Sequence, residues 1–535
     1  MRKSRLRSYF LVPSFIVLCA IVAGIMGSKG VSAASPAYDV DQSLKAFTKV
    51  YSTVEQNFAD EIKPEKGVYK GAIPGMLRTL DPHSNFFDPR DYAALREDQR
   101  GRYYGVGMSV QARNGKTIIM APFSGSPAYK AGLRPGDVIL EVNDKKTDNL
   151  TTTEVADLLK GPRGTKVQVK IGREGVDQPL VFNIIRDEIP RFSVQDAFYV
   201  KPGIGYVKVS QFNENTGKEL DEKLKKLNEK DMKGLVLDLR ENPGGLLNEG
   251  VDVASHFLKK GDLVVSHHGR SSPNKNYAAR ADGPGKDYPI VVLVNRYTAS
   301  AAEIVSGALQ DHDRGWILGE TTFGKGLVQT VFPLNDNTGL ALTTAHYYTP
   351  SGRLIQRDYS NISFLDYYTH SNLEQRNMAD VKMTDSGRTV YGGGGITPDE
   401  KYEPPKYNAF QIEVLRKYAF FNFSAKYFGN RDAKLPKGWE PGDDVVNEFR
   451  TFLESQKATF TPADFAANRE WVKQELKREM YITAFSQDES QKVAIEQDPE
   501  VLAAIDSMPK AKALVDTAKK LLVQRLQQDT RGAVR

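Results

Sequence analysis

The chain has 535 residues, which is too long for one ordinary hydrophobic core and predicts about two to four domains. Hydrophobic residues make up 40% of the chain and charged residues 26%, as in soluble globular proteins. The formal net charge of +6 is small for this length, and no basic stripe with interleaved aromatic residues occurs, so nucleic-acid binding is not expected.

The N-terminus is typical of an export signal. Basic residues precede an apolar run over residues 9–26, and small residues follow it. We expect cleavage after Ala33, which makes residues 1–33 a signal peptide. The apolar run is also long enough to span a bilayer, so an uncleaved membrane anchor is the alternative. In both cases the bulk of the protein is expected outside the cytoplasm, in the periplasm or on the cell-envelope side of the membrane.

The cysteine content limits the chemistry of the mature chain. The single cysteine, Cys19, lies inside the leader, so disulfides, thiolate metal sites and a cysteine nucleophile are excluded. His267 and His268 are adjacent on an expected strand, where their side chains point to opposite faces and cannot share a metal. We therefore expect no metal and no cofactor.

Residues 38–100 are expected to form a helical N-terminal domain. Apolar residues recur there at three- and four-residue steps. A second helix is expected over residues 68–80, and it stops at the turn Asp81-Pro82-His83-Ser84. We interpret His83 as a hydrogen-bonded structural group of this turn.

Residues 101–187 change to short strands and glycine turns. A loop of Gly105, Val106 and Gly107 is followed further on by the run AGLRPGDVILEVND. Together these resemble the PDZ domains of bacterial proteases. The backbone N–H groups of such a glycine loop can bind the terminal carboxylate of a peptide that adds a strand to the sheet edge. The loop is therefore the expected substrate-binding element.

Residues 188–400 alternate buried strands with helices, which predicts a layered α/β domain. Residues 234–239 form a continuous apolar run of the kind that is buried on both faces of a sheet. Residues 360–391 are a polar excursion without a clear period.

Residues 401–535 are expected to form a helical C-terminal extension. Apolar positions recur at helical spacing over residues 465–480 and 501–526, which predicts two amphipathic helices. Three roles are open for them: packing on the core, formation of a homo-oligomer, or docking of an adaptor protein.

Three segments of the α/β domain carry candidate chemistry. Ser300 begins a helix after a strand, and with Glu303 it forms a capping box, a structural pattern worth about 1 kcal/mol. The same turn would expose the serine hydroxyl beside N–H groups that can stabilise an oxyanion. The turn Pro243-Gly244-Gly245, which follows a buried strand, can also present N–H groups to an anion.

Lys325 is the second candidate, because it stands between glycines in an apolar stretch. To act as a base it must be neutral near pH 7, which requires lowering its pKa by roughly three units, about 4 kcal/mol. Burial can achieve this.

Read together, these segments resemble the C-terminal processing (tail-specific) peptidases. The matching runs are DLRENPGG, NRYTASAAE, GETTFGKGLVQ and YYTPSGRLIQ, in the order and approximate spacing of the family. The resemblance extends over roughly residues 40–400 and includes the PDZ domain. It implies a peptidase core with a crotonase/ClpP-like fold.

The resemblance also implies a role for each matching residue. Ser300 would attack the scissile carbonyl, Lys325 would remove its proton, and Gln329, one helical step further on, would orient the lysine. The N–H groups of Ala301 and Gly245 would form the oxyanion hole. We therefore expect an exported serine endopeptidase that recognises the C-terminal region of protein or peptide substrates.

The gating residue, a histidine base and a non-enzymatic function are the points on which the sequence offers alternatives. In such enzymes the PDZ domain can gate the active site. Relatives often carry an arginine before the Gly-Pro turn of that domain, whereas this chain has Lys160 there, with Arg163 close by, so either residue is a candidate for gating. A serine–histidine mechanism through His312 or His346 is disfavoured because neither residue lies in a catalytic motif of the family. The competing function is a catalytically idle PDZ scaffold, which the retained candidate residues disfavour.

Overall fold

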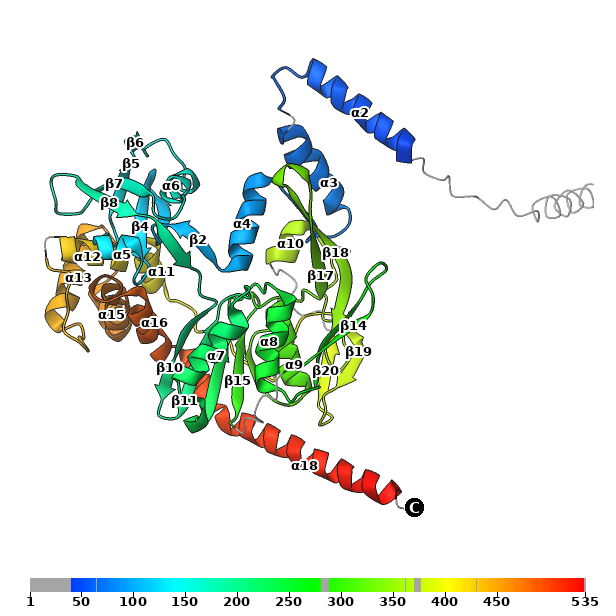
Figure 1. Ribbon diagram of the computed structural model, residues 1–535. Coiled ribbons are helices and arrows are strands. Elements are labelled where there is room, and N and C mark those ends of the chain that lie inside the picture. The colour runs from blue at the N-terminus through cyan, green and yellow to red at the C-terminus, as the bar shows by residue number, and fades with distance from the viewer. Residues whose placement is uncertain are drawn as a thin grey trace, which may run out of the picture. The chain divides into compact units, whose positions relative to one another are not determined.

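The computed structural model describes residues 40–63, 65–280, 288–360, 362–369, 377–429 and 431–533 (Figure 1). The predicted signal peptide and the alternative membrane anchor lie outside these residues. The chain divides after Met76 into two compact units. Within the described ranges, no helix combines the length and the apolar character that crossing a membrane requires.

The first unit is helical, as expected. Helix α2 (Val40–Asn57) carries the predicted apolar stripe, and its large side chains are exposed. The second expected helix begins as a π-helical segment, Glu65–Ala72, and continues as α3 (Ile73–Arg78).

The PDZ part of the second unit is built around an antiparallel sheet in the order β3-β4-β5-β7-β8. Strand β3 is one of the two edge strands of this order, and a buried apolar cluster lies between the sheet and its helices. The elements are β2 (Arg102–Gly105), β3 (Met108–Arg113), β4 (Lys116–Pro122), α5 (Pro127–Ala131), β5 (Val138–Val142), β6 (Lys145–Lys146), α6 (Thr152–Leu159), β7 (Lys166–Gly172), β8 (Leu180–Ile185) and β9 (Asp187–Pro190).

The peptidase core contains a second sheet, in the order β10-β11-β12-β15-β16-β21, which is parallel apart from the β10–β11 pair. Helices α7, α8 and α9 cover one face of it (Figure 1). The central strands are buried on both faces, as the apolar run over residues 234–239 predicts. The elements are β10 (Val194–Lys201), β11 (Ile204–Val209), α7 (Thr216–Lys226), β12 (Gly234–Asp238), α8 (Leu247–Phe257), β15 (Ile290–Val294), α9 (Ala301–Asp311), β16 (Trp316–Gly319) and β21 (Glu400–Lys401).

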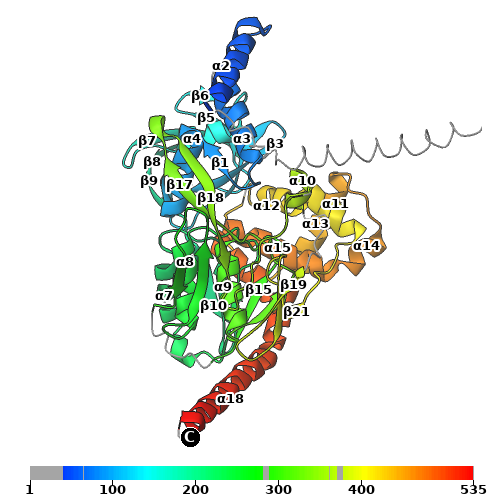
Figure 2. The same cartoon turned by 90° about the vertical axis from the view of Figure 1, so that its right-hand side faces the viewer.

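The last two helices, α17 (Pro499–Asp506) and α18 (Met508–Ala533), pack against the other face of this sheet (Figure 2). The expected single helix over residues 501–526 is therefore wrong. Pro509 has no N–H and would clash with the preceding turn, so α17 ends at Asp506 and a new helix starts with this proline in its first turn. Packing on the core is thus one role of the C-terminal extension.

The rest of the extension forms a separate aromatic-rich cluster, in which Phe420 and Phe449 stack at 4.8 Å. The expected helix over residues 465–480 is likewise two helices that meet at Asn468. The helices of this cluster are α11 (Ala409–Arg416), α12 (Ala419–Gly429), α13 (Asp443–Ser455), α14 (Pro462–Ala467) and α15 (Arg469–Ala484), whereas α16 (Gln487–Glu496) contributes Ile495 to the cluster on the other face of the core sheet.

A further sheet lies beside the core. Its strand β1 directly follows the Asp81–Ser84 turn and pairs with β18, and this pairing places the turn next to the core. The stretch over residues 360–391, in which the sequence showed no clear period, contains a short helix and a hairpin. The remaining elements are β1 (Asn85–Phe87), α4 (Pro89–Arg100), β13 (Leu263–His268), β14 (Lys275–Ala278), β17 (Leu327–Pro333), β18 (Gly339–Tyr348), α10 (Phe364–Thr369), β19 (Asn377–Met383) and β20 (Thr389–Gly392).

Candidate active site

Ser300 occupies a sharp turn between β15 and α9. Its backbone has φ 55° and ψ −116°, a conformation that residues other than glycine rarely adopt. Two hydrogen bonds hold it there: its N–H donates to the Glu303 carboxylate at 2.8 Å, and the Tyr347 hydroxyl donates to its carbonyl oxygen at 3.1 Å. The side chain is only half-buried. The turn thus presents a serine in a strained, fixed backbone.

Gly244 and Gly245 lie against this serine turn. A Cβ on Gly244 would be 2.7 Å from the Ser300 Cβ, and one on Gly245 would be 2.1 Å from the Phe212 carbonyl oxygen. Both glycines have positive φ, at 94° and 142°. Only glycine therefore fits at either position.

Two N–H groups are free at this place. Those of Ala301 and Gly245, the predicted oxyanion donors, have no backbone acceptor among the described residues. The Ala299 N–H donates to the Asn242 carbonyl oxygen at 2.9 Å, which fastens the glycine turn to the serine segment. The arrangement can accommodate an anion beside Ser300.

Lys325 lies between Phe323 and β17 and is half-buried. Its Nζ donates to Gln329 Oε1 at 2.7 Å, and the Gln329 amide donates to the His83 carbonyl oxygen. Burial lowers the pKa of Lys325, while Glu303 and Asp81 oppose this. The structure therefore places a lysine with a lowered pKa against a neutral amide.

Gln329 contacts Lys325 from a β-strand, whereas the four-residue spacing suggested one step along a helix. The segment is not helical: Gln329 belongs to strand β17. The β17–β18 register shifts between Val328 and Gln329, and such a bulge bends a strand and re-aims its side chains.

Glu303 is fully buried and connects the two candidate segments. In addition to the Ser300 N–H, its carboxylate accepts hydrogen bonds from Thr322 Oγ1 at 2.5 Å, from the Gly324 N–H at 2.7 Å and from the Lys325 N–H at 2.9 Å. Burial raises its pKa, and these hydrogen bonds oppose the rise. The capping box in the sequence predicts only the hydrogen bond from the Ser300 N–H. No local sequence pattern predicts the three hydrogen bonds from the segment of residues 322–325.

The Tyr347 hydroxyl makes a second link, because its one hydrogen is shared between the Lys325 carbonyl oxygen at 2.5 Å and the Ser300 carbonyl oxygen at 3.1 Å. No hydrogen bond joins Ser300 Oγ to Lys325 Nζ in the part of the chain that the structure describes. The two segments are thus held together through their backbones.

His83 lies beside this lysine–glutamine pair. Its Nε2 is 2.8 Å from the Tyr367 hydroxyl. Burial, assisted by the charge of Lys325, lowers its pKa to about 3, so the ring is neutral near pH 7. The expected hydrogen-bonded role agrees with this contact, whereas the sequence did not indicate its position next to Lys325.

His312, the alternative base considered above, lies at the opposite end of α9 from Ser300. His312 caps α9 and bonds to Asp385 at 2.8 Å. Although burial opposes protonation, Asp385 and the Leu263 carbonyl raise the pKa of His312 to about 9. A cation paired with a carboxylate is a poor general base near pH 7.

The predicted PDZ loop has the geometry of an anion site. Gly107 has φ 78°, and a Cβ there would lie 2.5 Å from the Ser126 Cβ. The N–H groups of Val106 and Gly107 have no backbone acceptor among the described residues. They precede β3, whose outer edge is free to pair with an added strand.

The two candidate gating residues are both in ion pairs. Lys160 bonds to Glu97 at 2.6 Å, and Arg163 bonds to Asp187 at 2.7 Å.

Comparisons with known proteins identify the family. Residues 203–361 match peptidase family S41, and residues 118–173 match the PDZ domain. The chain is 39% identical over 319 residues to the carboxy-terminal-processing protease of Bartonella bacilliformis, a match that covers 59% of this chain and 73% of that protein. It is 32% identical over 378 residues to the carboxy-terminal processing protease CtpA of Bacillus subtilis, covering 68% and 80%.

The chain belongs to the C-terminal processing peptidases. It is a serine-type peptidase with a PDZ domain, so the predicted family, enzyme class and fold class are confirmed. Among solved structures, a photosystem II D1 C-terminal processing protease is 30% identical and covers 67% of this chain and 87% of its own, with a TM-score of 0.35.

The contact between Gly244 and Ser300 generates a prediction for this peptidase. In Gly244→Ala the new methyl group would push against Ser300, so we expect kcat/KM to fall about 100-fold, the usual effect of misplacing reacting groups by about 1 Å. Peptide cleavage and thermal unfolding would be measured together.

Gly387→Ala is the matched control, because Gly387 has a similar φ of 88° and no atom within 4 Å of the added Cβ. It should lose a similar amount of stability from backbone strain but keep its activity. Equal activity of the two variants would contradict the role of close approach at Gly244.

Proposed function

We propose that this peptidase hydrolyses peptide bonds with Ser300 as nucleophile, Lys325 as general base and Gln329 as the residue that orients the lysine. The observation that carries the proposal is the environment of Lys325: burial lowers its pKa, and its amine bonds to a neutral amide rather than to a carboxylate. Such a lysine can be neutral at working pH and accept a proton.

In the proposed mechanism, neutral Lys325 takes the proton of Ser300 Oγ as the oxygen attacks the scissile carbonyl. The resulting oxyanion accepts hydrogen bonds from the free N–H groups of Ala301 and Gly245. Protonated Lys325 then gives its proton to the leaving amine. Loss of this amine breaks the peptide bond and leaves the acyl group on Ser300 Oγ. In the second half-reaction, Lys325 removes a proton from the water that attacks this acyl group, and it returns the proton to Ser300 Oγ as the acyl–serine bond breaks.

Substrate recruitment is assigned to the PDZ part. The C-terminal carboxylate of a protein or peptide binds the N–H groups of the loop Gly105-Val106-Gly107, and the preceding residues pair with the edge of β3. The substrates are exported proteins, because the N-terminal segment is expected to carry the enzyme out of the cytoplasm.

Two substitutions test the dyad. Ser300→Ala and Lys325→Met should each lower the cleavage of an unfolded protein at least about 1,000-fold, since members of such a unit are not individually dispensable. Lys382→Met is the control, because Lys382 is an exposed lysine paired with Asp380.

Unchanged cleavage in either active-site variant would refute the assignment. A wild-type enzyme that binds C-terminal peptides without cleaving any substrate would instead be the idle scaffold.

The pH dependence follows from the lowered pKa of Lys325. Protonated lysine cannot accept the Ser300 proton, so kcat/KM should rise with pH through this pKa and level off above it. His83 should add no step near neutral pH, because its pKa is about 3. A peptide cleavage profile that peaks in acid would contradict a lysine base.

Export is tested by cell fractionation and N-terminal sequencing of the mature protein. We expect an extracytoplasmic chain that begins at Ala34. An intact N-terminus in the membrane fraction would identify residues 9–26 as an anchor, and an intact cytoplasmic protein would contradict export.

A further inference from the structure

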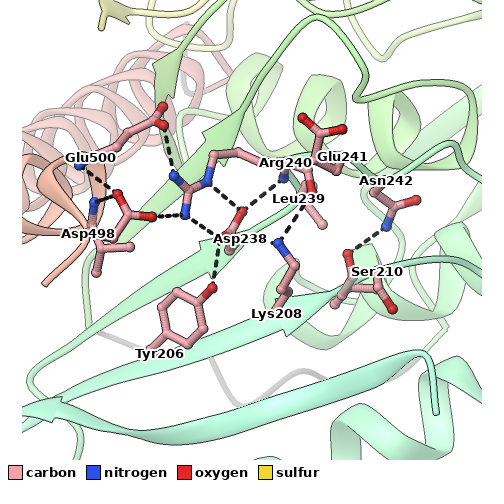
Figure 3. Close-up of polar contacts among 12 residues, drawn as sticks. Tyr206, Lys208, Ser210, Asp238, Leu239, Arg240, Glu241, Asn242, Asp498 and Glu500 are labelled. Carbon is pink, nitrogen blue, oxygen red and sulfur yellow. Dashed lines mark hydrogen bonds and ion pairs between the residues drawn. The ribbon is translucent and has the colours of Figure 1, made fainter. Parts of the chain in front are cut away.

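Arg240 lies between the last strand residue of β12 and the glycine turn of the active site, and it is bound by three carboxylates (Figure 3). Its Nε and Nη2 donate to the two oxygens of Asp238 at 3.0 and 2.7 Å. Asp238 is itself fully buried and accepts a further hydrogen bond from the Tyr206 hydroxyl at 2.7 Å. This half of the cluster is local to the peptidase core.

The other half comes from the C-terminal extension. Arg240 Nη2 is 2.8 Å from Asp498, and Nη1 is 2.8 Å from Glu500, at the start of helix α17. Asp498 also caps this helix by accepting from the N–H groups of Glu500 and Val501. Two carboxylates some 260 residues away in the chain therefore complete the surroundings of one guanidinium.

The guanidinium needs these distant acceptors. Its side chain is only 14% exposed, and Asp238 does not bind Nη1. Without Asp498 and Glu500, a nearly buried cation would keep one carboxylate for five N–H donors, and leaving such donors unpaired is costly. The Arg240 side chain would then rotate toward solvent to hydrate its unpaired N–H groups, and the Arg240 backbone would shift with it.

That backbone leads directly into the oxyanion turn. Lys208 Nζ donates to the Arg240 carbonyl oxygen at 3.4 Å. Two residues on, the Asn242 amide donates to the Val209 carbonyl oxygen at 2.7 Å, and its own oxygen accepts the Gly244 N–H at 2.8 Å. Only Glu241 separates Arg240 from Asn242, so a shift of the Arg240 backbone reaches Gly244 through the Asn242 side chain.

We propose that Asp498 and Glu500 are positioning residues for catalysis: by fixing Arg240 they hold the Gly244–Gly245 turn in register with Ser300. The inference rests on the proposed oxyanion role of this turn. It makes the N-terminus of α17 part of the active centre, in which it supports the chemical step and has no part in substrate recruitment.

The test uses the full-length enzyme with Asp498→Asn, Glu500→Gln and the double variant. Both substitutions keep side-chain size, and asparagine still caps a helix. Lys510→Met is the matched control, because Lys510 also ties a C-terminal helix to the core, through Glu400 at 2.7 Å, but does not contact Arg240.

We expect kcat to fall about 10- to 100-fold in the double variant while KM changes by less than about threefold, because an interaction used in the transition state is weakened. Hydrogen–deuterium exchange of the peptide containing residues 239–250 should become faster. Binding of a C-terminal peptide, measured in the Ser300→Ala background, should stay unchanged, and Lys510→Met should behave as wild type.

Unchanged kcat and exchange in the double variant would overturn the inference. An equal loss of kcat in Lys510→Met, or a loss that follows only the fraction of folded enzyme at the assay temperature, would also overturn it and indicate a general loss of stability. Failure of the proposed function is a separate outcome, because it would appear as undiminished wild-type cleavage in Ser300→Ala or Lys325→Met.

Discussion

The arrangement of this active site depends on one buried carboxylate. A buried carboxylate is stable only when its oxygens are supplied with donors, and Glu303 receives four, from both the serine turn and the lysine loop. The two segments cannot separate without leaving this charge unpaired. Glu303 therefore fixes the backbones of Ser300 and Lys325 relative to each other, while their side chains stay half-buried.

The sheet explains why these segments meet. Parallel strands have their carboxyl ends at one edge, and the three chemical segments each follow such a strand. The glycine turn follows β12, Ser300 follows β15, and the lysine loop follows β16. The covering helices differ on the two faces: α7, α8 and α9 on one, α17 and α18 on the other. The C-terminal extension thereby completes the layered core.

Local sequence reasoning succeeded where the determining interactions are local. The strand–turn–helix around Ser300 and the glycine-rich PDZ loop could be located from turn residues and apolar periodicity. The same reasoning was wrong about the segment of Gln329, because glycines and a short apolar run do not distinguish a bulged strand from a helix. It also joined α17 to α18, since the apolar period continues through Pro509.

The sequence by itself determined the family and the candidate residues, because the serine, the lysine and the glycine turn lie in short contiguous motifs with a family resemblance. Only the tertiary structure decided how they are supported. Gln329 meets His83 across 246 residues, and Arg240 meets Glu500 across 260. Pairings at such separations leave no period or spacing in the chain. They arise when strands and helices pack, and a buried polar group then bonds to whichever partner the packing has brought within reach.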